Sequence, residues 1–178
     1  MRHPLEFIPG NLRKLIFFVF LALTLLIFGV FRVLDAPLQT AAAPDGIVSF
    51  ELARTVGTAQ SILTSWDTNA RAYAAFGLGF DYLFMPVYAC ALSLGILLLM
   101  NGKPAWTLQF SAWMGWGVFA AALFDAMENY ALWMQLIGGA VSPFPEIAAL
   151  CASLKFALLA VGLLTVAAGG LIKKETPE

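Results

Sequence analysis

Three carboxylates are the residues of this sequence whose type and spacing best suit chemistry. Asp125 and Glu128 are three residues apart, so a helix would place them on one face, with Asn129 beside them. Asp81 lies in a different apolar stretch. Two adjacent carboxyl groups can serve as general acid and general base, and a third can share a proton with them. Asp125, Glu128 and Asp81 are therefore the catalytic candidates if the protein is an enzyme.

Basic and aromatic residues near these carboxylates extend the site. Lys155 or Arg32 could pair with the carboxylates or hold an anionic head group. Tyr88 shares a helical face with Asp81, and Pro86 leaves the Tyr82 carbonyl without its usual helical partner, which fits a kink beside a polar cavity. The ligand-binding candidates are Asp81, Tyr82, Tyr88, Asp125, Glu128, Asn129, Lys155 and Arg32.

Few cofactor classes are compatible with the sequence. The single histidine, His3, lies beside the N-terminus, which disfavours haem and zinc sites. Cys90 and Cys151 form no CxxC pair, which argues against dithiol chemistry. We predict no metal site, although Asp81, Asp125, Glu128 and Asn129 offer the oxygen ligands of a divalent cation. A net charge of -1 without a basic stripe gives no reason to expect nucleic acid as a partner.

The elements that position these residues are membrane helices. The chain has 178 residues, of which 61% are hydrophobic and only 12% charged, and that balance is typical of membrane proteins. Apolar runs long enough to cross a bilayer fall at about 13–33, 73–100, 105–137 and 146–172. We predict an all-α integral membrane protein, a four-transmembrane-helix bundle in which residues 1–178 form one domain.

The orientation follows from the positions of lysine and arginine. An even number of spans puts six of them on one side: Arg2, Arg13, Lys14, Lys103 in the Asn101–Pro104 turn, Lys173 and Lys174. The basic side of a membrane protein is usually cytoplasmic. We therefore expect a multi-pass protein of the cell (inner) membrane with its N- and C-termini in the cytoplasm. A cleaved signal peptide ending near Thr40–Ala43 is the alternative for the first run.

The outer loop, 34–71, is expected to contain an extracytoplasmic amphipathic helix. Apolar residues recur at helical spacing from Val48 to Trp66, and Asp45 is a plausible N-cap. This helix of about 18 residues would lie on the membrane interface with Trp66 at head-group level, or pack over the bundle as a lid.

The charged residues should share one depth in the membrane. Arg32, Asp81, Asp125 and Lys155 each lie about 17–21 residues from the inner boundary, which is roughly 26–32 Å at 1.5 Å per helical residue. With Glu128, the layer has three acids and two bases, an excess of one negative charge. Such charges are costly near a bilayer and are usually paired or face a wet cavity. The layer is either a structural ion-pair network or a functional pocket.

Three functions remain open. The first is binding of membrane lipid, or of a lipid-like or hydrophobic ligand, in a polar pocket near the outer leaflet. The second is an intramembrane enzyme that acts on a lipid or isoprenoid with a carboxylate acid/base pair. The third is an accessory subunit or a proton- or ion-coupled transporter, with a homo-oligomer or another membrane protein as partner. The first is the function we expect.

Overall fold

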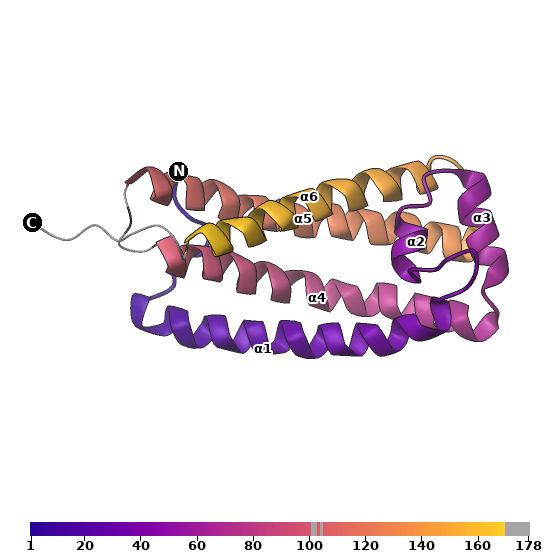
Figure 1. Ribbon diagram of the computed structural model, residues 1–178, viewed down its shortest axis with the longest axis horizontal. Coiled ribbons are helices and arrows are strands. Elements are labelled where there is room, and N and C mark those ends of the chain that lie inside the picture. The colour runs from indigo at the N-terminus through magenta and orange to yellow at the C-terminus, as the bar shows by residue number, and fades with distance from the viewer. Residues whose placement is uncertain (101–102, 104, 170–178) are drawn as a thin grey trace, which may run out of the picture.

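Four long helices form a bundle in the computed structural model, which describes residues 1–100, 103 and 105–169. The long helices are α1 (Gly10–Asp35), α4 (Thr68–Met100), α5 (Ala105–Gly138) and α6 (Phe144–Gly169). A 3-10 turn, η1 (Ala36–Leu38), and two short helices, α2 (Ile47–Glu51) and α3 (Val56–Ser65), connect α1 to α4. Figure 1 shows α2 and α3 at one end of the bundle and the N-terminus at the other.

Each long helix is long and apolar enough to span a bilayer. Among the described residues these candidate spans are Gly10–Leu38, Thr68–Leu99, Trp106–Gly138 and Phe144–Gly169. The predicted all-α class with four membrane-span candidates is therefore confirmed. The predicted turn at 101–104, apart from Lys103, and the predicted end of the last span at 170–172 lie outside the described residues, as do Lys173 and Lys174.

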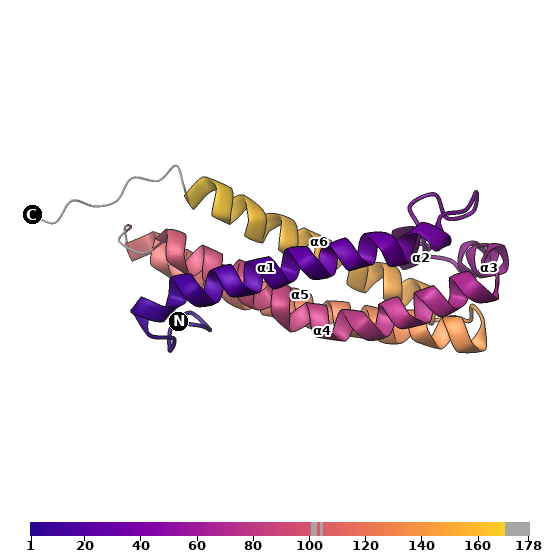
Figure 2. The same ribbon diagram turned by 90° about the horizontal axis from the view of Figure 1, so that it is seen from below.

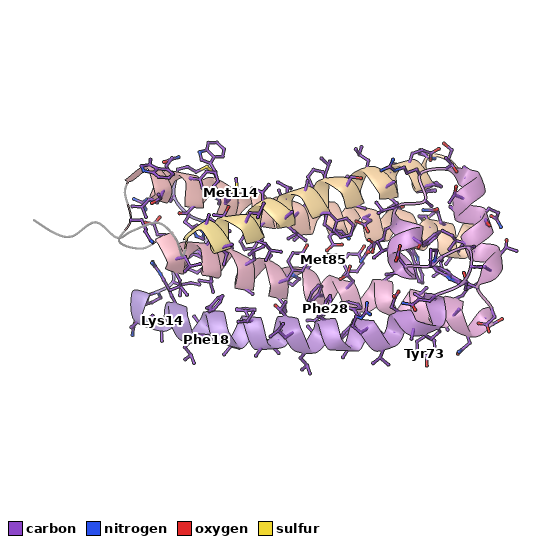
Figure 3. All side chains as sticks on the ribbon, viewed as in Figure 1. Lys14, Phe18, Phe28, Tyr73, Met85 and Met114 are labelled. Atoms are coloured by element: carbon purple, nitrogen blue, oxygen red, sulfur yellow. The ribbon has the colours of Figure 1, made fainter. Side chains whose placement is uncertain are left out.

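Helix α1 is the least embedded of the four. It packs along α4 and η1, whereas α5 packs extensively against both α4 and α6. Within α1, which is described in full, Ile27 is the only buried residue. Many of its large side chains are exposed, as Phe18 is in Figure 3, and this suits a helix whose solvent is lipid.

The connection between α1 and α4 differs from the predicted single amphipathic helix. The chain leaves the helical conformation after Glu51, and Arg54 adopts a left-handed backbone with φ of 62°. The Thr55 side chain then caps α3 by accepting a hydrogen bond from the Thr58 N–H. Apolar periodicity continues across this break, which is why the pattern alone suggested one helix.

The start of α2 also differs from the prediction. Gly46, with φ of 58°, and not Asp45, occupies the N-cap position. The first helical N–H, that of Ile47, donates to the Asp35 carboxylate at 2.7 Å. The assignment of the cap to Asp45 was therefore wrong. A cap from a residue twelve positions away cannot be recognised from local spacing.

Helices α2 and α3 pack onto the bundle as a cap. Trp66, predicted at head-group level, is only 2% exposed, and its indole N–H donates to the Leu38 carbonyl at 2.8 Å. Phe50 packs edge-to-face on the Trp66 ring, and both join a core cluster with Leu132 of α5 and Ala148 of α6. The lid arrangement, one of the two expected, therefore describes this segment.

The first eight residues fold back against the opposite end of the bundle. His3 is buried, and its Nδ1 accepts a hydrogen bond from the Leu5 N–H. Its Nε2 lies 3.4 Å from the Ser93 hydroxyl of α4, and it packs so closely on Gly115 of α5 that any β-carbon there would collide with the ring.

Candidate functional site

The centre of the site is an ammonium group surrounded by carboxylates from two other elements. Lys155 of α6 lies 3.0 Å from Asp125 and 2.9 Å from Glu128, both of α5, and 3.7 Å from Glu51 of α2. All four side chains are buried. The expected pairing of Lys155 with Asp125 and Glu128 is confirmed, and the cap contributes a third carboxylate.

Asp125 is held on both sides. One of its oxygens accepts from Lys155, and the other accepts from the Tyr88 hydroxyl of α4 at 2.9 Å. Because both partners are buried, this hydrogen bond and this ion pair fix the Asp125 side chain and hold the three helices in register. Asp125 therefore links α4, α5 and α6.

Asp81 belongs to the same region through a different partner. Its carboxylate accepts a hydrogen bond from the Asn129 amide at 2.8 Å, and the same amide nitrogen donates to the Leu78 carbonyl at 3.2 Å. Asn129 lies one residue after Glu128 on α5, so it brings Asp81 of α4 next to the Lys155 cluster. The structure thus gathers Asp81, Tyr88, Asp125, Glu128, Asn129 and Lys155 at one level of the bundle.

Two predicted site residues do not join this cluster. Arg32 of α1 is exposed, and within the described part of the chain its side chain has no hydrogen bond or ion pair. Tyr82 is 49% exposed, and its hydroxyl donates to the Ala126 carbonyl at 3.2 Å. Equal depth in the sequence therefore did not ensure that Arg32 pairs with the carboxylates.

Glu51 is the site residue that sequence reasoning missed. It is 9% exposed, and its Oε2 atom has no hydrogen-bond partner among the described residues. Burial raises the pKa of the Glu51 carboxyl above its ordinary value of 4.5, while the neighbouring Lys155 opposes that shift. The available signal was its spacing: three residues after Val48, Glu51 falls on the apolar face of the expected helix.

The cluster holds more acid than base. Four buried or partly buried carboxyl groups, those of Glu51, Asp81, Asp125 and Glu128, share one buried ammonium, that of Lys155. Buried charges of like sign at short range cannot all remain ionised without a counter-charge. The group therefore needs protons or a bound cation to be stable.

The described side chains of the cluster are not arranged to bind a metal ion. Among the residues that the structure describes, no three histidine, cysteine, aspartate or glutamate side chains are placed to share one ion. The ammonium of Lys155 occupies the position between the carboxylates of Asp125 and Glu128. Of the four oxygen ligands suggested by the sequence, Asp125 and Glu128 therefore contact a lysine. The other two, Asp81 and Asn129, contact each other.

A cavity of about 690 Å³ adjoins the cluster. It lies between α1 and α6, with α4 beneath, and α1 and α6 diverge toward the end of the bundle that holds the N-terminus (Figure 2). Its apolar part extends to Phe17, Gly95 and Val166, and its other end reaches Leu38. From Phe17 to Asp35 the cavity follows about 27 Å of α1 at 1.5 Å per residue.

All the charged residues that line the cavity lie toward its cap end. They are Arg32, Asp35, Glu51, Asp81, Asp125 and Lys155. The remaining wall is dominated by aliphatic and aromatic side chains such as Phe28 and Phe84. Figure 3 shows Met85 between α4 and the α5–α6 pair, on the inner side of the bundle next to this region. The cavity is therefore itself amphipathic, with a long apolar section and one charged end.

Comparison with protein families, with characterised proteins and with solved structures found no match for this chain.

Proposed function

We propose that this chain is a multi-pass membrane protein that binds a lipid-like molecule in the cavity between α1, α4 and α6. The observation that supports this most is the amphipathic cavity itself. A single-chain amphiphile would place its tail along the apolar section and its head group at the charged end. The volume of about 690 Å³ falls within the usual range of small-molecule sites, about 300–1,000 Å³.

The membrane orientation is part of this proposal. Arg2, Arg13 and Lys14 precede or begin α1, and Lys103 lies near the same end of the bundle. By the positive-inside tendency this end is cytoplasmic, so the cap and the charged cluster face the other side. The head-group end of the cavity would then lie near the outer leaflet of the cell membrane, with both termini in the cytoplasm.

The acid/base enzyme is less well supported than binding. Asp125 and Glu128 are the pair that such an enzyme would use, but Glu128 is fully buried and is not part of the cavity wall. Both carboxylates are engaged by Lys155 at 3.0 and 2.9 Å. A general acid or base must reach the reacting atom within hydrogen-bond distance, and Glu128 has no open path to a ligand.

Two glycines of α4 allow a matched test of the cavity. A β-carbon added at Gly77 or at Gly79 meets nothing within 4 Å, but only Gly77 lines the cavity. Gly77→Leu should therefore fill the cavity without disturbing the fold, and Gly79→Leu should leave it open. Both substitutions replace glycine inside the same helix, so their effect on helix propensity is equal.

The measurement is the lipid retained by each purified variant after extensive detergent exchange, quantified per protein by mass spectrometry. We expect the wild type and Gly79→Leu to retain the same amphiphile, and Gly77→Leu to retain about tenfold less, equivalent to about 1.4 kcal/mol of binding free energy. Equal retention by Gly77→Leu and Gly79→Leu would show that the cavity is not the binding site.

A further inference from the structure

The charged end of the cavity has an acidic bias that constrains the ligand. The charged residues of its wall are four acids, Asp35, Glu51, Asp81 and Asp125, and two bases, Arg32 and Lys155. Glu128 lies directly behind the wall, within 2.9 Å of Lys155. If all these groups were ionised, the region would carry five negative and two positive charges. An anionic head group would add to this excess.

Lys155 is not available to attract an anion. Its ammonium contacts Asp125, Glu128 and Glu51 at 3.0, 2.9 and 3.7 Å. An ammonium has three N–H donors, and the two nearest carboxylates already accept from it. The anion-binding role that the sequence suggested for Lys155 would require breaking a buried ion pair. Arg32 remains as an anion contact in the cavity wall, but it is exposed, so that contact would be weakened by water.

Glu51 supplies a carboxylate in the wall whose nearest donor is too far away for a hydrogen bond. Its side chain is about nine-tenths buried and lines the cavity, and its Oε2 atom lies 3.7 Å from the Lys155 ammonium, with no hydrogen-bond partner among the described residues. Buried carboxylate oxygens are rarely left without a donor, because the lost solvation is costly. A donor brought by a ligand would satisfy this atom, and a positively charged donor would also offset the acidic excess.

These observations rest on the proposed function and extend it to the chemistry of the head group. We infer that the ligand is an amphiphile with a protonated amine head group, held by Glu51 beside Asp81 and Asp125. The amine N–H groups donate to the Glu51 oxygen that lacks a hydrogen bond, and the positive charge of the amine replaces protons that the carboxylates otherwise need. The apolar tail lies along Phe28 and Phe84 toward the opposite end of the cavity.

The test compares three single-chain probes that differ only in head group. Hexadecylamine, hexadecanol and hexadecyl phosphate would compete with radiolabelled hexadecylamine for the protein in nanodiscs of phosphatidylcholine, with empty nanodiscs subtracted. We expect the amine to bind about tenfold more tightly than the alcohol, and the phosphate more weakly than the alcohol. Tighter binding of the phosphate, or equal binding of all three, would overturn the inference.

Two acidic residues at the same end of the bundle provide the matched variants. Glu51→Gln should weaken amine binding about tenfold and change alcohol binding less than about twofold. Asp45→Asn removes the same charge from an exposed position outside the cavity and should change neither. Glu51→Asp, which keeps the charge, should retain the preference for the amine and also reports on folding of this segment. An amine preference that survives in Glu51→Gln would contradict the assignment.

The cavity-filling variant separates failure of this inference from failure of the proposed function. If alcohol and amine bind equally and Gly77→Leu abolishes both, the cavity binds amphiphiles and the head-group inference is wrong. If no probe binds, or if Gly77→Leu leaves binding of every probe unchanged, the proposed function itself is wrong.

Discussion

The carboxylate of Glu128 and the ammonium of Lys155 meet at 2.9 Å, and Glu128 has no exposed surface. The two residues come from α5 and α6, the helices that pack most extensively against each other. Their contact is the most buried part of a network in which one cation faces several acids. Substitution of the basic residue should therefore lower the free energy of unfolding much more than substitution of one acidic residue.

Lys155→Met should destabilise the protein far more than Glu128→Gln. Removing the only buried ammonium of the cluster leaves Glu51, Asp125 and Glu128 facing one another, and breaking a buried pair in this way costs about 3–5 kcal/mol. Removing one acid from an acid-rich group should cost about 1 kcal/mol. Unfolding by sodium dodecyl sulfate in mixed micelles would compare the two free energies of unfolding. A larger loss in Glu128→Gln than in Lys155→Met would show that the acidic excess is not real.

Tyr88→Phe should cost about 1.5–3 kcal/mol of folding free energy. The Tyr88 hydroxyl donates a buried hydrogen bond to Asp125 at 2.9 Å, and hydrogen bonds to charged groups are the strong ones. Tyr82→Phe is the matched control, since it removes an equal hydroxyl that donates to a carbonyl at a half-exposed site. We expect less than about 1 kcal/mol for the control in the same unfolding assay. Equal effects would mean that the Tyr88 contact contributes no more than an exposed one.

Gly46→Ala should loosen α2 and thereby displace Glu51. Gly46 has φ of 58°, and an added β-carbon would collide with the Asp35 carboxylate that caps the helix. The left-handed backbone alone costs a non-glycine residue about 1–2 kcal/mol. Gly57→Ala in α3 is the control, because its β-carbon meets nothing within 4 Å and alanine should stabilise a helix by up to about 1 kcal/mol. The readout is thermal stability in detergent, with opposite signs expected for the two variants.

The free energy of unfolding should decrease as the pH falls below about 6.5, because His3 is buried. Burial lowers the pKa of this imidazole from 6.5 to about 4; Glu6 opposes the shift and Arg13 adds to it. Between these values the unfolded chain binds more protons than the folded protein, so folding free energy is lost as the pH falls from 6.5 toward 4. We expect a loss on the order of 2 kcal/mol from this residue. His3→Asn, whose amide oxygen can still accept from the Leu5 N–H, should show a smaller loss over the same pH range. Identical profiles for the two proteins would exclude His3 as the cause.

A reporter experiment can decide the orientation in the membrane. A phosphatase that is active only outside the cytoplasm should be inactive when fused after Glu178 and active when inserted near Asp45. A fluorescent protein that folds only in the cytoplasm should give the opposite pattern. Activity of the phosphatase after Glu178 would show that the predicted orientation or the predicted number of spans is wrong.

The helices were predictable because membrane spans depend on length and apolar content, which are local properties of the sequence. The pairing of Lys155 with Asp125 and Glu128 was also predictable, since buried charges at one depth have few other partners. The lack of an ion pair at Arg32 among the described residues was not predictable, because helical depth does not determine which side chains come within contact distance. Those distances depend on how α1 packs along α4, which a sequence pattern does not specify.

The cap was the least predictable element for the same reason. Its break depends on the left-handed Arg54, and its first N–H is capped by Asp35 from a distant part of the chain. Glu51 enters the cluster only because this break turns α2 over the end of the bundle. Periodicity indicated which residues of this segment are apolar, but not where the helix ends.

The position of Lys155 in the last helix has a consequence for the order of assembly. During synthesis Asp81, Asp125 and Glu128 enter the membrane before Lys155 has been made, because α4 and α5 precede α6 in the chain. Until α6 arrives, the buried ammonium of this cluster is absent, and the acids must be compensated by protons, by water or by the exposed Arg32 of α1. We therefore expect a chain that ends after α5 to be degraded in the cell. The final helix supplies both the packing partner of α5 and the ammonium that compensates the buried acids.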